Sequence, residues 1–329
     1  MVRRVKLLST GKYLPKNRVT ASDIEQRLGL PKDWVEQKSG VLVRHFVEDE
    51  TASLMGALAA KDALAAAGLS IEDIDCIIST SGIPEQSIPC TAALVQKHLG
   101  AIDAGIPAFD INSTCLSFIT GFDTISYLIE AGRYRRVLLV ASEVCTGLNW
   151  HDRESCTLFG DGAAAAILAR SERGESARIL TSSMETYSKG AHLTECTGGG
   201  NKYHPKDYAD NLESFLFRMD GRGVYRMASE ILPRFVDSLL QTAELKIADL
   251  QMVIPHQASL MAMRLICKQL GIAPEKFMTI IQTHGNTIAA SVPMALHEAI
   301  HQNKIQRGDL VLLLGTSAGF SVGGIVLEY

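Results

Sequence analysis

Two stretches of this 329-residue chain repeat one pattern. Residues 62–75 read DALAAAGLSIEDID, and residues 238–251 read SLLQTAELKIADLQ. Four pairs fall in step: Ala67/Ala243, Leu69/Leu245, Ile71/Ile247 and Asp73/Asp249. Each stretch predicts the end of a helix, a short link and the start of an apolar strand, at 76–78 in the first copy and at 252–254 in the second.

The correspondence continues outward from these stretches. A helix that ends in Leu-Gly follows each time, at residues 99–100 and 270–271, as is typical of a helix closed by a left-handed glycine. A further strand, a turn and a helix come next, then an apolar strand at 137–141 or 310–314 and a small-residue turn into a last strand. Strands that alternate with helices predict parallel pairing, and continuous apolar strands suit a sheet covered on both faces. We therefore expect an α/β chain of two similar halves, 1–170 and 171–329, that enclose one cleft at the carboxyl ends of their strands.

The repeat is interrupted in residues 171–235. A strand is expected at 178–181, and a polar, glycine-rich segment from Gly198 to Pro205 follows it. This composition predicts an exposed loop or a lid-like insertion near 185–215. A plain surface insertion explains the same residues equally well.

Composition excludes several classes of protein. Apolar residues make up 47% of the chain, and 32 Lys and Arg against 36 Asp and Glu give a net charge of −4, which argues against nucleic-acid binding. No apolar run is long enough to cross a bilayer, and the first residues do not form a secretory signal. Seven cysteines without a Cys-x-x-Cys pair argue against a disulfide framework or a structural zinc site, and indicate a reduced, cytoplasmic protein.

Cys115 stands out among the cysteines because it lies where a strand gives way to a mostly apolar helix that runs to Ala131. Unpaired N–H groups at a helix start carry about +0.5 e, which predicts a lowered thiol pKa and a reactive nucleophile. A buried structural cysteine is the alternative, and it is the better interpretation of a cysteine taken at random.

Two polar residues of the second half occupy related places. His256 follows the strand at 252–254, and Asn286 is expected to follow the next strand, in a turn that is the counterpart of the Cys115 turn. Taken alone, each residue has a purely structural interpretation: His256 as a histidine of the core and Asn286 as a helix cap. Together, the internal repeat predicts that Cys115, His256 and Asn286 face one cleft.

A turn of small residues, 315–319, could bring backbone N–H groups close to a ligand oxygen. We expect no metal site. His297 and His301 lie four residues apart on a predicted helix, but without a carboxylate partner they are interpreted as a surface pair. No phosphate-binding Gly-x-x-x-x-Gly-Lys and no dinucleotide-binding Gly-x-Gly-x-x-Gly motif is present.

These residues resemble the thiolase superfamily and, within it, the β-ketoacyl-ACP synthase III family, over essentially the whole chain. The resemblance rests on Phe109-Asp110-Ile111-Asn112 before Cys115, Phe159-Gly160-Asp161-Gly162-Ala163, His256-Gln257-Ala258, His284-Gly285-Asn286-Thr287 and Ala289-Ala290-Ser291-Val292-Pro293.

The resemblance implies a thiolase-like fold, with two duplicated α/β halves in a five-layered α-β-α-β-α arrangement, and a cytoplasmic homodimer. It implies transfer of an acyl primer from acyl-CoA to Cys115. A decarboxylative Claisen condensation with malonyl on acyl carrier protein then gives β-ketoacyl-ACP, in fatty acid or related biosynthesis. His256 and Asn286 would complete the catalytic triad, and backbone N–H groups of Cys115 and Ala318 would form the oxyanion hole. The expected substrate-binding residues are Trp34, Lys38, Ser39, Arg153, Gly221 and Ser259, with the coenzyme A thioester as a substrate and no further cofactor.

The chain departs from the family pattern at Leu116-Ser117, at Thr316-Ser317-Ala318-Gly319, at Ser259 and at Met261. A specialised acyltransferase or ketosynthase, with a longer or carboxylated primer in secondary metabolite or biotin-precursor synthesis, therefore stays open. A degradative thiolase is disfavoured because the C-terminal turn lacks a second cysteine, and the intact triad argues against a non-catalytic partner subunit.

An acidic carrier protein requires a local basic patch. Three clusters are candidates, and a solvated helix surface is the alternative for each: Arg133, Arg135 and Arg136; Arg218, Arg222 and Arg226, whose spacing predicts one helix face; and Arg264 with Lys268.

Overall fold

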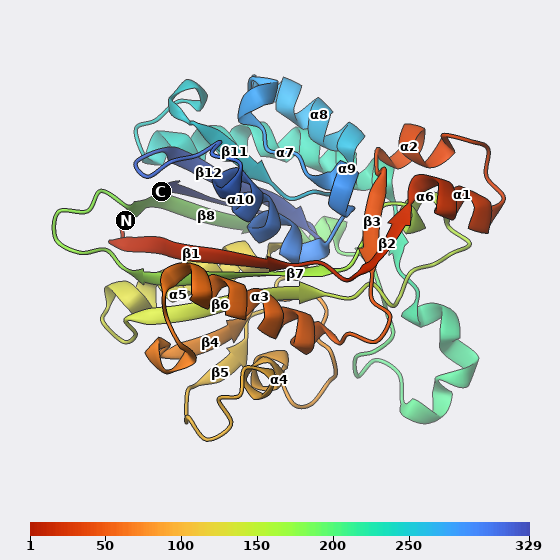
Figure 1. The fold of residues 1–329 in the computed structure, drawn as a ribbon. Coiled ribbons are helices and arrows are strands. Elements are labelled where there is room, and N and C mark those ends of the chain that lie inside the picture. The colour runs from red at the N-terminus through yellow and green to blue at the C-terminus, as the bar shows by residue number, and fades with distance from the viewer.

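The computed structural model describes residues 1–329, apart from the side chain of Pro205. Two mixed β-sheets form its centre, one in each half of the chain (Figure 1). The first has the order β1-β7-β6-β4-β5 and the second the order β11-β12-β13-β8. The strand bounds are β1 Val5–Tyr13, β4 Cys76–Ser79, β5 Ala108–Asp110, β6 Arg136–Glu143, β7 Gly162–Arg170, β8 Arg178–Thr186, β11 Met252–Pro255, β12 Leu310–Ser317 and β13 Ser321–Glu328.

The parallel pairing expected from the repeat is confirmed for only part of each sheet. Strand β4 runs parallel to β5 and β6, and β11 runs parallel to β12. The remaining pairs, β1 with β7, β6 with β7, β12 with β13 and β13 with β8, are antiparallel. For β12 and β13 the reason is the short turn that joins them without a crossover helix.

Helices cover both faces of both sheets and give the five layers that the resemblance implies (Figure 1). Helices α3 and α4 cover the outer face of the first sheet, α7 and α8 that of the second, and α5 and α10 lie between the sheets. The central core cluster accordingly draws apolar side chains from both sheets. The helix bounds are α3 Ala52–Ala67, α4 Thr91–His98, α5 Ser117–Glu130, α7 Gly221–Thr242, α8 Leu260–Gln269 and α10 Ser291–His301.

The remaining elements lie at the edges of this core. They are α1 Ala21–Leu28, α2 Trp34–Ser39, α6 Arg153–Cys156 and α9 Ile281–His284, and the short strands β2 Asn17–Thr20, β3 Val43–Phe46, β9 Thr194–Glu195 and β10 Arg218–Met219. The 3-10 helices are η1 Ile71–Asp73, η2 Thr114–Leu116, η3 Ser188–Gly190, η4 Pro205–Asp207, η5 Ala209–Phe215, η6 Ile247–Asp249, η7 Pro274–Lys276 and η8 Ile288–Ala290.

The repeated aspartates that first indicated the duplication have one structural role. The Oδ2 atom of Asp73 accepts the backbone N–H of Ser70 at 3.0 Å, and that of Asp249 accepts the N–H of Lys246 at 2.7 Å. Each bond closes a 3-10 turn between an outer helix and the strand that follows it, β4 in the first half and β11 in the second. The repeated residues are therefore the ones that set the entry angle of β4 and β11.

Small residues allow the close layering. Strand β7 reads GAAAAILAR and is buried on both faces up to its last residue. A Cβ atom on Gly11 of β1 would lie 2.2 Å from the carbonyl oxygen of Ala59 in α3. Alanine and glycine at these positions let helix backbones approach the sheet, which larger side chains would prevent.

Two sequence-based predictions are wrong in detail. The counterpart of β5 in the second half is a single bridge between Val253 and Phe277, followed by the short helix α9 where a strand was expected. His297 is not a surface residue, because it is buried and its Nδ1 lies 3.1 Å from Oγ1 of Thr10. In the part of the chain that the structure describes, no helix is both long enough and apolar enough to span a membrane.

Candidate active site

Cys115 lies in the turn η2, between the end of β5 and the start of α5. Asn112 shapes this turn, because its Oδ1 accepts the backbone N–H of Thr114 at 2.8 Å. Thr114 has a φ of 52°, a left-handed conformation that is rare for a β-branched residue. The thiol is therefore presented by a strained turn rather than by a regular helical N-terminus.

The Asn286 turn has the same construction. The Oδ1 atom of Asn286 accepts the N–H of Ile288 at 2.9 Å, and Ile288 has a φ of 48°. The helices that follow the two turns begin with serines at corresponding places, Ser117 and Ser291. The two turns pack against each other through η2 and η8. The structure thus places the Cys115 and Asn286 turns face to face, as the repeat predicts.

His256 follows β11 directly and is fixed by two contacts. Its backbone N–H donates to the carbonyl of Leu314 at 2.8 Å, and its Nδ1 lies 2.6 Å from Oγ of Ser291. The same Oγ accepts the N–H of Gln257, so its own proton is free to point to Nδ1. Burial lowers the pKa of His256 to about 4, which leaves the ring neutral with its proton on Nε2.

The three residues converge on one place. The amide Nδ2 of Asn286 donates to the carbonyl of Ala258 at 3.4 Å, which ties it to the loop that begins at His256. Leu116 and His256 meet at Gly315, where an added Cβ would lie 2.9 Å from Leu116 Cδ2 and 3.2 Å from His256 Cβ. A thiol, a neutral imidazole and a carboxamide donor are therefore grouped at the carboxyl ends of the strands.

The predicted lowering of the Cys115 pKa is wrong. Burial, followed by the charge of Glu143, raises the pKa of the Cys115 thiol to about 12. Backbone groups of Ala318 and Cys115 act in the opposite direction and are outweighed. The dipole of the following helix cannot compensate for a site that is enclosed by protein and borders on a carboxyl group.

Those two backbone groups lie close to the Cys115 sulfur and are the ones predicted to form the oxyanion hole. Ala318 lies in the turn between β12 and β13, and its carbonyl accepts a hydrogen bond from Thr114 Oγ1 at 3.4 Å. This bond joins the Ala318 turn to the residue before the thiol. Gly319 and Phe320 have φ values of 82° and 50°, which make the turn tight enough to approach the sulfur.

Glu143 is a buried carboxyl group beside the candidate site that the sequence reasoning missed. It is fully buried at the end of β6 and accepts the backbone N–H groups of Gly82 and Ile83, and of Ala289 in η8. Burial raises its pKa to about 8 despite these bonds. The signal that could have identified it is a lone carboxylate directly after an otherwise apolar strand.

An apolar cluster borders the thiol. Cys145, Leu148, Leu158 and Phe159 are its buried members, and Phe217 packs edge-to-face on Phe159 with ring centroids 5.0 Å apart. Cys145 lies close enough to Cys115 that the charge of Cys115 contributes to the raised pKa of the Cys145 thiol. The cluster is separate from the three main apolar cores of the chain.

The predicted coenzyme A contacts lie on elements around the same edge. Trp34 begins α2 and is half-buried, Lys38 is exposed on α2, and Arg153 is exposed at the start of α6. Arg27 of α1, which packs against α2, stacks on Trp150 at 3.7 Å from the ring centroid, three residues before Arg153.

The other three predicted contacts differ in accessibility. Ser259 is half-buried and directly precedes α8. The next residue, Leu260, packs closely on Gly40, the residue that ends α2, because an added Cβ on Gly40 would lie 2.4 Å from it. Gly221 is exposed at the start of α7. Ser39 is buried, and its hydroxyl donates to the carbonyl of Val35 at 2.8 Å and accepts the N–H of Val41. Its hydroxyl therefore closes α2 and does not face a ligand.

One basic cluster differs from the prediction. Arg218 lies on β10, before α7 begins at Gly221, so it shares no helix face with Arg222 and Arg226. In the described part of the chain, no three His, Cys, Asp or Glu side chains are placed to hold a metal ion.

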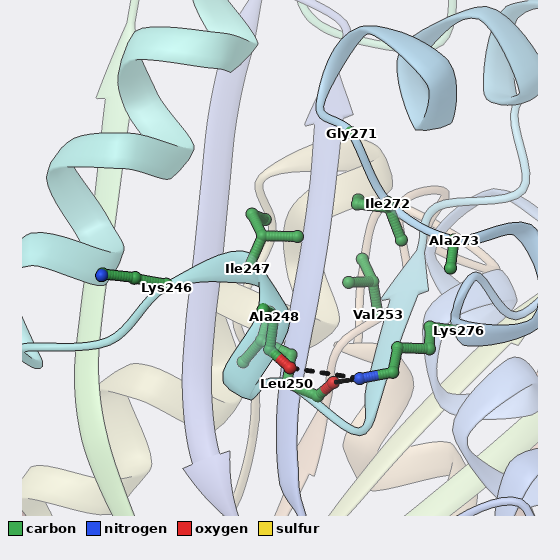
Figure 2. Close-up of a pocket in the computed structure, with 9 residues that line it drawn as sticks. All are labelled: Lys246, Ile247, Ala248, Leu250, Val253, Gly271, Ile272, Ala273 and Lys276. Atoms are coloured by element: carbon green, nitrogen blue, oxygen red, sulfur yellow. Dashed lines mark hydrogen bonds between the residues drawn. The ribbon is translucent and has the colours of Figure 1, made fainter.

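A surface pocket of about 450 Å³ lies away from these residues (Figure 2). It is lined around the start of β11 by Ile247, Leu250, Val253 and Ile272, and Lys276 Nζ closes its rim by donating to the carbonyl of Leu250 at 2.7 Å. His256 follows the opposite end of this strand, so the pocket is not part of the candidate active site.

Comparison with known proteins assigns the family. Residues 109–188 match the profile described as 3-oxoacyl-[acyl-carrier-protein (ACP)] synthase III, and residues 240–329 match the one for its C-terminal part. The chain is 37% identical to the β-ketoacyl-[acyl-carrier-protein] synthase III of Aquifex aeolicus over 98% of its length and 99% of that protein. It is 34% identical to that of Neisseria gonorrhoeae, with the same coverage of both chains.

A solved structure agrees with the sequence comparison. The crystal structure of 3-oxoacyl-[acyl-carrier-protein] synthase III from Aquifex aeolicus superimposes with a TM-score of 0.90 at 35% identity, over 99% of this chain and 100% of that one. The five-layered duplicated fold and the match over the full length lead to one conclusion: the chain belongs to the β-ketoacyl-ACP synthase III family, a family of acyltransferase-type condensing enzymes.

Proposed function

We propose that this enzyme joins an acyl primer from acyl-CoA to malonyl carried on acyl carrier protein and releases a β-ketoacyl-ACP. The observation that carries the proposal is the meeting of the Cys115, His256 and Asn286 turns beside an apolar cluster, in a chain that matches the family over its full length.

In the first step, the Cys115 sulfur attacks the thioester carbonyl of acyl-CoA. The bond from that carbonyl to the sulfur of coenzyme A breaks, and the thiol proton leaves with free coenzyme A. The backbone N–H groups of Cys115 and Ala318 stabilise the tetrahedral oxyanion. Because the free thiol has a pKa near 12, its proton must leave as the carbon–sulfur bond forms, and it passes to the departing sulfur of coenzyme A.

In the second step, malonyl-ACP loses its carboxylate as carbon dioxide, and the electron pair moves into a thioester enolate. Nε2–H of His256 and Nδ2–H of Asn286 donate to the enolate oxygen. The enolate carbon attacks the acyl group on Cys115, the carbon–sulfur bond breaks, and the released thiolate takes a proton from water. Coenzyme A therefore takes part as a substrate, and the acyl chain packs on the cluster of Leu148, Phe159 and Phe217.

Trp34, Lys38 and Arg153 are proposed to hold coenzyme A, and Gly221 and Ser259 to border it, since all lie on elements around the thiol-bearing edge. We extend the proposal to residues 185–215 as a lid. The backbone N–H of Phe217, just after this segment, donates to the carbonyl of Gly147 at 2.9 Å, which anchors the end of the segment beside the apolar cluster.

We further propose a homodimer that works in the cytoplasm. Strand β5 is the open edge of the first sheet, and large apolar side chains are exposed near it: Phe109 at 38%, Ile102 at 75% and Ile88 at 85%. Apolar exposure at a sheet edge is typical of a surface that pairs with another chain. All seven cysteines of the described chain are free thiols, which fits a reducing compartment.

The test is intact-protein mass spectrometry followed by product analysis. Incubation with a panel of acyl-CoA thioesters should add one acyl mass to the wild type and none to Cys115→Ala, and malonyl-ACP should then convert the adduct into β-ketoacyl-ACP. Absence of any adduct would leave a non-catalytic member of the family. Preference for long or carboxylated primers would favour the specialised synthase over the fatty acid enzyme.

A further inference from the structure

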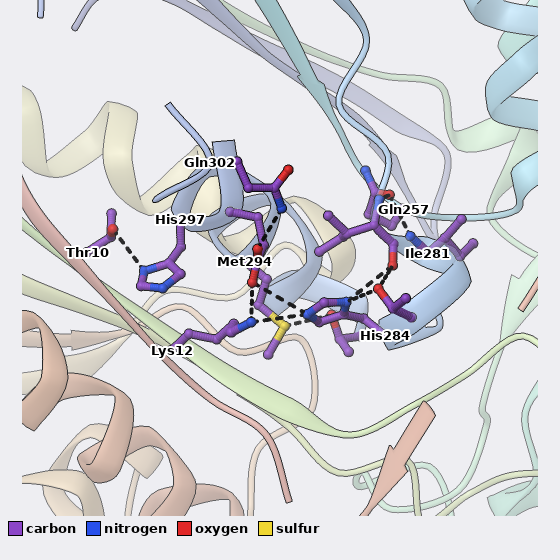
Figure 3. A network of polar contacts seen from close by, with 12 residues as sticks. Thr10, Lys12, Gln257, Ile281, His284, Met294, His297 and Gln302 are labelled. Carbon is purple, nitrogen blue, oxygen red and sulfur yellow. Dashed lines mark hydrogen bonds and ion pairs between the residues drawn. The ribbon is translucent and has the colours of Figure 1, made fainter. Parts of the chain in front are cut away.

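A half-buried lysine from the first half of the chain reaches His284, two residues before Asn286 (Figure 3). Lys12 extends from β1 of the first half into the second half, where its Nζ contacts the carboxylate of Glu298 in α10 and lies 3.3 Å from Nε2 of His284. The three side chains are 20%, 18% and 8% exposed. A lysine that is half-buried is stabilised when its charge is paired, as it is here with Glu298.

The contacts of His284 show which ring nitrogen carries the hydrogen. A lysine ammonium can only donate, so Nε2 must accept from Lys12. Nδ1 lies 3.2 Å from the carbonyl of Ile280, which can only accept, and 2.9 Å from Oγ1 of Thr283. The Thr283 hydroxyl donates its own proton to the same carbonyl at 3.1 Å, so Nδ1 carries the hydrogen. Both partners therefore require the same neutral tautomer.

The charges around the ring agree with this assignment. Lys12 of β1, Glu298 of α10 and His45 of β3 are the titratable groups that influence it. Burial, followed by the Lys12 charge, lowers the pKa of His284 to about 4. For Glu298, burial alone would raise the pKa, but the hydrogen bonds from Lys12 and Gln302 hold it below its ordinary value.

His284 is the last residue of α9, two positions before Asn286. Gly285 between them is confined, since an added Cβ would lie 3.0 Å from the carbonyl oxygen of Leu158. The N–H of Asn286 donates to that carbonyl at 2.8 Å, and its own carbonyl accepts the N–H of Gly160 at 3.2 Å. A displacement of His284 therefore has little room to be absorbed before it reaches Asn286.

The other end of α9 is held by the residue after His256. Oε1 of Gln257 accepts the N–H groups of Ile280 and Ile281 at 2.8 and 3.1 Å (Figure 3). Helix α9 is thus fixed at its start by the His256 loop and at its end by Lys12. It is the link that sets the His256 and Asn286 donors relative to each other.

We propose that Lys12 is a positioning residue for the condensation step, which anchors His284 and thereby orients the Asn286 amide toward the enolate oxygen. The inference rests on the proposed role of Asn286. It assigns to Lys12 no contact with the substrate, and it leaves the transfer of the acyl group to Cys115 independent of this lysine.

The test compares the two half-reactions in Lys12→Met. Acylation of Cys115 by acyl-CoA should stay within about twofold of the wild type, whereas kcat for condensation with malonyl-ACP should fall about 10- to 100-fold, the range expected for a donor misplaced by part of an ångström. Lys12→Arg, which keeps a cation between Glu298 and His284, should recover most of the loss.

Lys6→Met is the matched control. Lys6 lies on the same strand, is 14% exposed and pairs with Glu175 at 2.6 Å, on the part of β1 away from Asn286. Both half-reactions should remain within about twofold of the wild type in this variant. An equal loss in Lys6→Met and Lys12→Met would reduce the role of Lys12 to general stability and overturn the inference.

A second readout follows the ring itself. Histidine-detected NMR of the full-length protein should show His284 with its proton on Nδ1, and Lys12→Met should make it titrate at a higher pH, because a nearby positive charge is lost while Glu298 remains. Unchanged titration of His284, or condensation at the wild-type rate in Lys12→Met, overturns the inference.

Asn286→Ala distinguishes a failure of the proposed function from a failure of the Lys12 inference. If this variant condenses normally, Asn286 has no role in condensation, and the Lys12 inference fails with it. If it is slow while Lys12→Met is not, only the Lys12 inference fails.

Discussion

Cys115, the proposed nucleophile, has surroundings that oppose its ionisation. Desolvation is the larger cause and the charge of Glu143 the second, so the glutamate is the part that a single substitution can remove. Since burial raises the pKa of Glu143 itself to about 8, its negative charge develops only as the pH rises through that value.

Glu143→Gln should therefore make Cys115 more reactive toward iodoacetamide. The thiolate fraction rises about tenfold for each unit by which the thiol pKa falls, and we expect a rate about 3- to 10-fold higher at pH 9. The difference from the wild type should shrink toward pH 7, where Glu143 is protonated. Peptide mass spectrometry locates the label, with exposed Cys196 as the internal reference and buried Cys267 as a check against unfolding. Equal Cys115 rates at pH 9 would contradict the electrostatic role.

Ser291 decides which nitrogen of His256 carries the proton. Without its hydroxyl at Nδ1, the ring can take the other tautomer, in which Nε2 has no hydrogen to donate. Ser291→Ala should lower the condensation rate roughly 10- to 100-fold and acyl transfer less, as measured in the two half-reactions. Ser126→Ala is the matched control, because Ser126 is equally buried but bonds only to the carbonyl of Asp123 within α5. A similar effect of both substitutions would show that only packing was lost.

At the scale of elements, the segment before β7 holds the Asn286 turn by backbone contact. A Cβ on Gly160 would lie 2.4 Å from the carbonyl oxygen of His284, a distance that backbone atoms do not tolerate. Gly160→Ala should therefore displace the turn, lower the free energy of unfolding by about 1–3 kcal/mol and slow condensation more than acyl transfer. Urea unfolding and the two half-reactions measure this. Gly200→Ala, which has open space around its Cβ, should change neither quantity.

The helices and turns that could be predicted are those specified by residues close to them in the sequence. The left-handed glycines at the ends of α3, α4 and α8, and the aspartates that close η1 and η6, act within a few positions along the chain. Helix α9 was predicted as part of a strand because its counterpart in the repeat is one. It is helical because Gln257, more than 20 residues earlier, supplies Oε1 to its first N–H groups, a contact that no local pattern reveals.

The site divides in the same way. The meeting of the Cys115 and Asn286 turns follows from the duplication, since they are counterparts in the repeat and pack against each other through η2 and η8. The ionisation of the thiol did not follow, because it depends on Glu143 and on enclosure by both halves. The contacts of Lys12 could not be predicted for a similar reason, because its partners lie more than 270 residues away in the sequence.

For the whole molecule, buried imidazoles determine how stability depends on pH. Burial lowers the pKa values of His256, His284 and His297 to about 4, against 6.5 when exposed. The unfolded chain therefore binds more protons between these values, and stability is lost as the pH falls from about 6.5 toward 4. Glu143 acts oppositely, because a raised carboxyl pKa contributes stability that is complete below about 4.5 and lost by pH 8.

Three imidazoles outweigh the carboxyl, so the free energy of unfolding should fall on the order of 3 kcal/mol between pH 6.5 and 4.5. Urea unfolding at four pH values from 4.5 to 7.5 measures the slope. His297→Gln removes the imidazole that lies outside the proposed site, and it should make the slope shallower without changing its sign. A flat or rising profile toward low pH would show that these rings are protonated in the folded protein.

The proposed dimer makes the last prediction, at the open edge of the first sheet. A lysine at position 109 would place a charge on the middle residue of β5, where two copies of the strand would meet, and charges on edge strands oppose such pairing. Phe109→Lys should convert a dimer into a monomer, with half the molar mass by light scattering at the same protein concentration. Leu212→Lys is the control, because Leu212 is also apolar and 68% exposed but lies on η5, far along the chain from this edge. A wild type that is monomeric, or a Phe109→Lys protein that stays dimeric while folded, would place the subunit contact elsewhere and leave the apolar exposure at β5 to another partner.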